Sequence, residues 1–262
     1  MKTGRKTVSA LWLLVGIVTL MSGAAQAQII PIPIYDDKEK RTISVVVTPG
    51  LERTTRLRGQ ELRDARRAMN AGEQISEELM RELAINRDSL AAMKLVEILV
   101  ARGLRENASD IAYFASIAVA AGRVWPLPEM VEAMRHIDPK TEDQERIKKY
   151  IAVIYAHAWA GNSLALDAVI EFNGPDALFG EMGGITRRRL EEQARIADNG
   201  RIELRLALRM MEQGNLSPSE VEAVRGYLDN VQNSPVLGMR AIGFNLNGLL
   251  DEEYGPAEVS SE

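Results

Sequence analysis

Residues 150–161 read YIAVIYAHAWAG, a run of alanines and larger apolar side chains that ends in a glycine. Three other stretches have the same character: AAMKLVEILVARG at 91–103, IAYFASIAVAAG at 111–122 and IELRLALRMMEQG at 202–214. The runs at 91–103, 111–122 and 150–161 are apolar almost all round, which is typical of helices buried between layers. Their alanines would let neighbouring helices approach closely. A glycine after such a run is typical of a left-handed helix end, so we expect helix-ending turns at Gly103, Gly122, Gly161 and Gly214.

The glycine spacing indicates a repeat. Gly122, Gly161 and Gly200 lie 39 residues apart, about the length of two helices with their turns. A period of roughly 20 to 50 residues is typical of helical arrays. Helix starts are also signalled, most clearly by Ser217-Pro218-Ser219-Glu220, which combines an N-cap, a first-turn proline and a capping-box glutamate. Further N-caps are predicted at Ser76, Asp88, Ser109 and Thr141. The predicted helices are 52–71, 77–86, 89–102, 109–121, 127–137, 142–160, 163–172, 186–198, 201–213, 218–230 and 236–250.

The sequence therefore predicts an all-α fold, an α-solenoid of antiparallel helix pairs over residues 51–250. Residues 28–50 differ from it and are expected to be extended or β. The prolines within Ile30–Ile34 disfavour a helix there. Thr42–Thr48 is rich in β-branched residues and predicts one short strand. The acidic residues 251–262 are expected to form a disordered tail.

The N-terminus has the three parts of a secretory signal, over residues 1–27. A basic start leads into an uncharged apolar stretch at 8–21, and a small-residue end predicts cleavage between Ala27 and Gln28. The alternative is an uncleaved membrane anchor, because 8–27 carries no charge and ~20 apolar residues can span a bilayer. We expect a periplasmic or secreted protein, touching the membrane only through this segment if it is not removed.

Composition excludes several classes of function. The chain has no cysteine, which rules out disulfides, thiolate nucleophiles and cysteine metal sites. Its formal net charge is −5, and removal of the basic signal would make the remainder more acidic. Sequence-independent binding to nucleic acid needs a basic surface, so we expect no nucleic-acid partner. No cofactor motif is present, and no cofactor is expected.

The segment Glu191–Gly214, EEQARIADNGRIELRLALRMMEQG, resembles tetratricopeptide repeats and the related Sel-like repeats. The resemblance includes the alanine-x-glycine helix ends and the period near 39, and it extends in degenerate form over about 76–250, with an irregular stretch at 172–185. In those families tandem helix pairs build a right-handed superhelix. The families usually bind other proteins or serve as scaffolds and adaptors, and the resemblance implies such a role here.

Aromatic and basic side chains are the candidate binding residues. On the predicted inner helices, Tyr113, Tyr155 and Trp159 could anchor a partner, although filling the core is at least as good an interpretation. The basic run at 53–67 could dock an acidic partner or an anionic lipid, or could be an ordinary solvated helix face. The candidates within that run are Arg63, Arg66 and Arg67.

Residues that could perform catalysis are sparse. The two histidines, His136 and His157, are far apart and favour structural roles, at a helix end and in the core. Pairs of glutamates such as Glu129 with Glu132 are most simply solvated surface. We therefore predict a non-catalytic scaffold or adaptor that binds an envelope or periplasmic protein. The alternatives are an accessory to a glycan-acting cell-wall enzyme and a carrier of a small ligand or lipid.

Overall fold

The computed structural model describes residues 41–256. The chain divides into two units, Met1–Ile34 and Tyr35–Glu262, and the described residues all lie in the second. The predicted signal at 1–27, its cleavage point and the extended Ile30–Ile34 therefore lie outside the described residues, as does the end of the acidic tail. Within 41–256, no helix combines the length and the hydropathy needed to cross a membrane.

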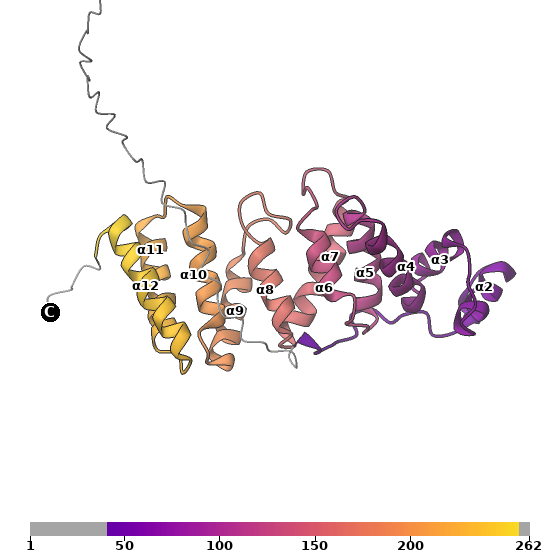
Figure 1. Cartoon of the computed structure of the whole chain (residues 1–262), viewed down its shortest axis with the longest axis horizontal. Coiled ribbons are helices and arrows are strands. Elements are labelled where there is room, and N and C mark those ends of the chain that lie inside the picture. The colour runs from indigo at the N-terminus through magenta and orange to yellow at the C-terminus, as the bar shows by residue number, and fades with distance from the viewer. Residues whose placement is uncertain (1–40, 257–262) are drawn as a thin grey trace, which may run out of the picture. The chain divides into compact units, whose positions relative to one another are not determined.

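The described part is all-helical, and it contains no β-strand (Figure 1). A short 3-10 turn, η1 (Thr54–Arg56), precedes eleven α-helices. These are α2 (Gln60–Asn70), α3 (Glu77–Ile85), α4 (Ser89–Arg102), α5 (Ala108–Ala120), α6 (Leu127–Met134), α7 (Gln144–Trp159), α8 (Ser163–Phe172), α9 (Gly184–Ala197), α10 (Arg201–Gln213), α11 (Pro218–Gln232) and α12 (Leu237–Tyr254).

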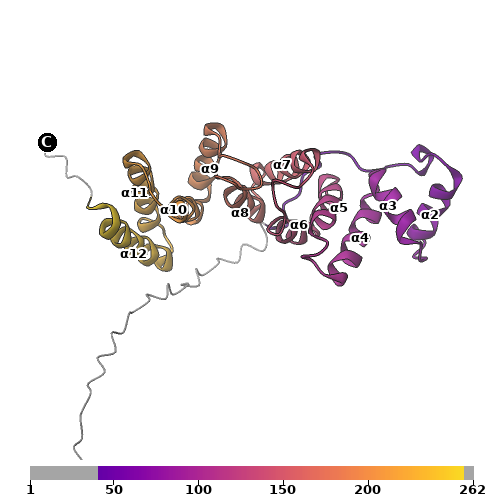
Figure 2. The same cartoon turned by 90° about the horizontal axis from the view of Figure 1, so that it is seen from above.

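Helices that are adjacent in the sequence pack against each other (Figures 1 and 2). The most extensive contacts are those of α5 with α4 and α6, of α11 with α10 and α12, of α7 with α8, and of α3 with α4. Contacts of α5 with α7 and of α8 with α10 join one pair to the next. Several alanines of α4, α5 and α8 are fully buried, which lets these helices come close enough to share one core.

Five of the eleven α-helices in the described part, α3, α4, α7, α8 and α11, follow an N-cap residue whose side chain accepts a hydrogen bond from the first turn. Ser76 and Asp88 are N-caps as predicted, and Ser217 with Glu220 forms a complete capping box. Two predicted N-caps are wrong. Ser109 lies inside α5, which begins after Asn107, and α7 is capped by Asp143 rather than by Thr141.

Three other predictions need correction. Thr42–Thr48 is not a strand, because its only ladder contact is a single antiparallel bridge from Val46 to Ala121. The helix expected over 52–71 begins only at Gln60, after a 3-10 turn. The acidic tail does not begin at Asp251, because α12 continues to Tyr254.

The four glycines expected at helix ends all have positive φ: Gly103, Gly122, Gly161 and Gly214. At Gly122 a second constraint applies, because an added Cβ would lie 3.1 Å from Cγ2 of Val46. Glycine there satisfies both the backbone conformation and the close approach of residues 41–51.

Candidate functional site

Residues 41–51, here called the leading segment, run across three helix–helix turns in the reverse of their order in the chain. The segment meets the α7–α8 turn first, then the end of α5, and then the α3–α4 turn. Hydrogen bonds hold it at each place. They join Asn162 Nδ2 to Ile43 O (2.8 Å), Val47 N to Ala120 O (2.8 Å) and Leu51 N to Arg87 O (2.8 Å).

Two buried polar side chains hold the start of the leading segment. The Nδ2 of Asn162 donates to the carbonyl oxygens of Arg41 and Ile43, while its Oδ1 caps α8. The Nε2 of His157 accepts from the backbone N–H of Val45 at 3.4 Å. Burial lowers the pKa of His157, partly offset by the hydrogen bond with the Val153 carbonyl, so its ring is neutral at pH 7. His157 is therefore the structural core histidine that we predicted.

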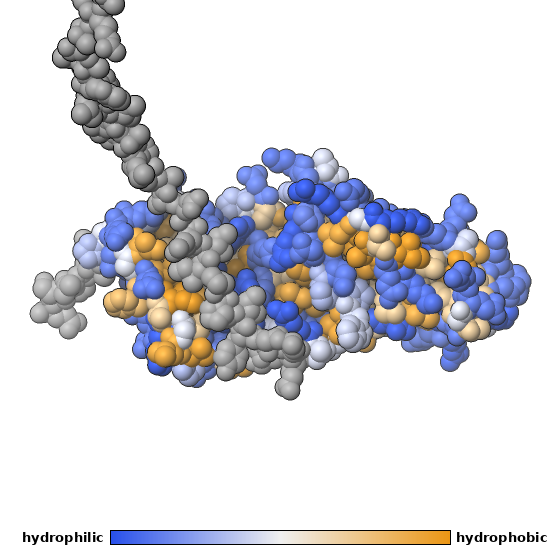
Figure 3. Space-filling model, in the orientation of Figure 1, coloured by the Kyte–Doolittle hydropathy of each residue, from blue (hydrophilic) through white to orange (hydrophobic). Residues whose placement is uncertain are grey.

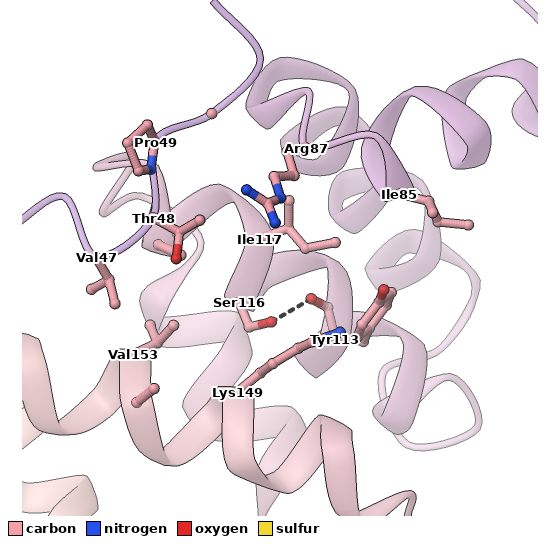
Figure 4. A pocket seen from close by; sticks show the side chains of 13 residues that line it. Val47, Thr48, Pro49, Ile85, Arg87, Tyr113, Ser116, Ile117, Lys149 and Val153 are labelled. Carbon is pink, nitrogen blue, oxygen red and sulfur yellow. Dashed lines mark hydrogen bonds between the residues drawn. The ribbon is translucent and has the colours of Figure 1, made fainter. Parts of the chain in front are cut away.

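A groove of about 430 Å³ lies between the leading segment, the α3–α4 turn, α5 and α7 (Figure 4). Its volume falls within the range of small-ligand pockets, about 300–1,000 Å³. The lining is mainly apolar, and no aspartate or glutamate contributes to it. The lining residues are Val47, Thr48, Pro49, Gly50, Ile85, Arg87, Tyr113, Ser116, Ile117, Ala120, Lys149, Ala152 and Val153.

Two exposed cations give the groove its charge. Arg87 stands in the α3–α4 turn with a φ of 66°, and its side chain extends over the groove in Figure 4. Lys149 reaches from α7 toward Tyr113, with its Nζ 4.8 Å from the centre of the ring. The guanidinium of Arg146 lies 4.4 Å from the same ring centre and is itself paired with Asp110. The aromatic ring of Tyr113 therefore lies beside two positive charges, which its π electrons attract.

The other two predicted aromatic anchors lie on α7, beyond the groove. Tyr155 contacts the rings of Trp159 and Phe179 edge-on, and its hydroxyl donates to Asn173 Oδ1 at 3.0 Å. Trp159 lies beneath the guanidinium of Arg189, 5.5 Å from its ring centre. Both are half-buried and packed against the core, so of the three aromatics only Tyr113 lines the groove.

The predicted basic residues of α2 are not brought together into one surface. Arg66 is mostly buried and pairs with Asp88 at 2.6 Å, so its guanidinium forms an internal ion pair and is not presented to a partner. Arg63 donates to the Leu57 carbonyl, and Arg67 pairs with the exposed Asp64. None of the three lines the groove.

Other titratable side chains considered as catalytic or metal-binding candidates do not gather into one site. His136 lies 3.6 Å from Glu132, and Glu142 accepts from the hydroxyl of Tyr150, whose pKa burial raises. Among residues 41–256 no group of three or more histidine, aspartate or glutamate side chains could hold a metal ion. Glu203 is buried, its Oε2 has no hydrogen-bond partner in the described structure, and burial raises its pKa.

The sequence did not reveal the groove because its charges come from turns and helix surfaces. Arg87 and Lys149 are single basic residues that only the packing of α3, α5 and α7 brings together. Chemically, the arrangement can hold an apolar group on its floor and a carboxylate at its cations. Comparisons of the chain with protein-family models, with curated proteins and with solved structures found no match.

Proposed function

We propose that the chain is a non-catalytic scaffold or adaptor of the periplasm, an α-solenoid built from helical repeats that binds an envelope or periplasmic protein. The groove beside the leading segment is the observation that carries the proposal. Its occupant is an extended, acidic segment of the partner, with an apolar side chain between Pro49 and Ile117 and a carboxylate at Arg87 and Lys149.

Electrostatics support an acidic partner segment. Arg87 and Lys149 are both exposed, so the pocket has positive groups at its mouth and no lining carboxylate to neutralise them. Charge-assisted hydrogen bonds to a carboxylate are stronger than neutral ones and favour one binding orientation. Tyr113 adds an amphipathic wall of the kind enriched at protein interfaces.

The packing of the helices supports a scaffold role. Helix pairs in chain order, joined by contacts between alternate helices, are the arrangement in which repeat proteins display binding surfaces. The export signal expected from the sequence supports a location in the cell envelope.

The proposal is tested by charge reversal at the groove. Arg87→Glu combined with Lys149→Glu should abolish capture of the partner in crosslinking from intact periplasm, and should weaken binding of an acidic peptide derived from that partner. The matched control combines Lys148→Glu with Arg58→Glu, two exposed cations outside the groove. Both pairs should melt at the wild-type temperature. Equal capture by the groove variant and the control would place the binding surface elsewhere.

A carrier of a small amphipathic anion is the second candidate, because the groove has a ligand-sized volume and an apolar floor. Ala152→Trp separates the two functions. A bulky side chain at this lining position should exclude a small ligand that fills the groove, whereas a partner held mainly by Arg87 and Lys149 should retain much of its affinity.

A further inference from the structure

The outward face of α12, the last described helix, is apolar. Leu237, Ala241, Phe244 and Gly248 are separated by four, three and four residues, which places them on one face. All four are exposed, Leu237 at 72% and Phe244 at 70%. Hydrophobic residues gather over α12 in Figure 3. A repeat array usually ends in a polar face, so an apolar face at this end indicates a contact with another molecule.

The spacing of these residues is that of a two-helix seam, in which side chains of one helix fit between those of another. Large and small residues alternate along the seam. When two copies of α12 lie antiparallel, Leu237 meets Gly248 and Phe244 meets Ala241, and the same register satisfies both pairs. We infer that α12 binds α12 of a second copy of this chain about a two-fold axis.

Glycine at position 248 fits this arrangement. An added Cβ there would meet no atom within 4 Å, so nothing inside the described fold requires a glycine. Its φ is not in the positive region either. In the antiparallel register the position lies opposite Leu237 of the second copy, and the missing side chain leaves room for it.

The polar residues beside the seam are complementary in the same register. Asn247 donates to Asp229, but its Oδ1 is buried with no partner among residues 41–256. It lines a groove of about 370 Å³ together with Asp229 and Asp251. Arg240, exposed on the same edge of α12, would lie opposite Asn247 of the second copy. An arginine there can face the exposed carboxylate of Asp229, whereas Asp251 is already paired with Arg225 of the same chain.

The dimer should be reversible. One helix face is smaller than the roughly 800 Å² that each partner buries in a standard stable interface. We therefore expect association on the order of micromolar concentrations. The pairing uses none of the residues of the groove beside the leading segment, so it stands or fails independently of the proposed function.

Sedimentation velocity over about 1 to 200 μM, a range that brackets micromolar affinity, measures the association. The purified protein should shift from monomer to dimer. Phe244→Glu should weaken the dimer by at least about tenfold. Gly248→Leu should weaken it too, while leaving the monomer folded by circular dichroism. The control Ile185→Glu, at a residue equally exposed on α9, should dimerise like the wild type. A wild-type protein that stays monomeric throughout would overturn the inference.

Cysteine crosslinking tests the register, because the chain has no cysteine of its own. Leu237→Cys and Gly248→Cys should each give little disulfide dimer when oxidised alone, since like positions lie at opposite ends of the seam. A mixture of the two variants should give a disulfide between position 237 of one copy and 248 of the other. Efficient disulfide formation within each single variant would show parallel helices and would overturn the proposed register.

Discussion

The side-chain amide of Asn162 donates to the carbonyl oxygen of Ile43 at 2.8 Å, across 119 positions in the sequence. The same side chain caps α8 by accepting from the backbone N–H of Ala165 at 3.0 Å. One asparagine thus begins a helix and holds the leading segment on that helix. Because Asn162 is fully buried, its side chain makes these bonds without competition from water.

Asn162→Ala should destabilise the protein by roughly 2 to 3 kcal/mol, the sum of a lost N-cap and of two lost hydrogen bonds to partly buried carbonyls. Urea unfolding measures the change. Hydrogen exchange at the backbone amide of Val45 should also accelerate more than exchange in α5, because the leading segment loses its first attachment. The control is Asn233→Ala, since Asn233 is exposed and its side chain bonds only to its own helix at Asp229. Unchanged exchange at Val45 would show that the segment is held without Asn162.

Gly161→Val should cost about 1–2 kcal/mol, because a β-branched residue resists the φ of 94° found at that position. Ile43 Cδ1 lies 3.8 Å from the added Cβ, so backbone strain is the larger cause. Thermal unfolding checks the value. Gly226→Ala should instead stabilise the protein, raising the free energy of unfolding by about 0.5–1 kcal/mol, because Gly226 lies inside α11 with open space around it. Equal effects of the two substitutions would contradict the assigned backbone conformations.

The helices of this fold could be predicted from the sequence because their signals are local. The predicted bounds of α4, α8 and α10 match the observed ones: each is an apolar run, α4 follows the predicted N-cap Asp88, and α4 and α10 each end at a glycine. The strand prediction at Thr42–Thr48 failed for a related reason. Its β-branched residues do favour extended backbone, but they contact helix ends, and no neighbouring strand is available to complete a ladder.

The candidate site was harder to predict because it depends on contacts between distant residues. Tyr113 could be proposed from its type and its helix, whereas Arg87 could not, since nothing in the sequence shows that its turn faces the leading segment. The sequence pattern alone does not distinguish the roles of the neighbouring arginines Arg66 and Arg67 in α2. Only packing distinguishes Arg66, which reaches the buried Asp88, from Arg67, which stays at the surface.

That difference between Arg66 and Arg67 is measurable. Arg66→Met should destabilise the protein by about 3 to 5 kcal/mol, because it leaves the carboxylate of Asp88 buried without its cation. Arg67→Met should change stability by less than about 1 kcal/mol, because its pair with Asp64 is exposed. Denaturant unfolding of both variants under one set of conditions gives the comparison. A small effect at Arg66 would mean that its hydrogen bonds to Asp88, Thr54 and Leu51 are not formed together.

His157 should make the attachment of the leading segment sensitive to pH. Its Nδ1 donates to the Val153 carbonyl at 2.9 Å, which leaves Nε2 as the acceptor for the Val45 N–H. Burial lowers the pKa of His157 in the folded state, so below the unfolded-state pKa of about 6.5 the unfolded chain binds more protons. Stability contributed by the neutral ring is therefore present above that pH and decreases as the pH falls through 6.5.

Between pH 7 and pH 5 the wild type should lose more stability than His157→Gln, which keeps one donor and one acceptor but does not titrate. Exchange at Val45 should accelerate over the same range in the wild type, because a protonated Nε2 presents a second donor to the Val45 N–H. His136→Gln is the control, because His136 lies near the surface beside Glu132 and does not contact the leading segment. If His157→Gln and the wild type lose stability in parallel as the pH falls, the acid sensitivity comes from other groups and His157 acts only as a fixed acceptor.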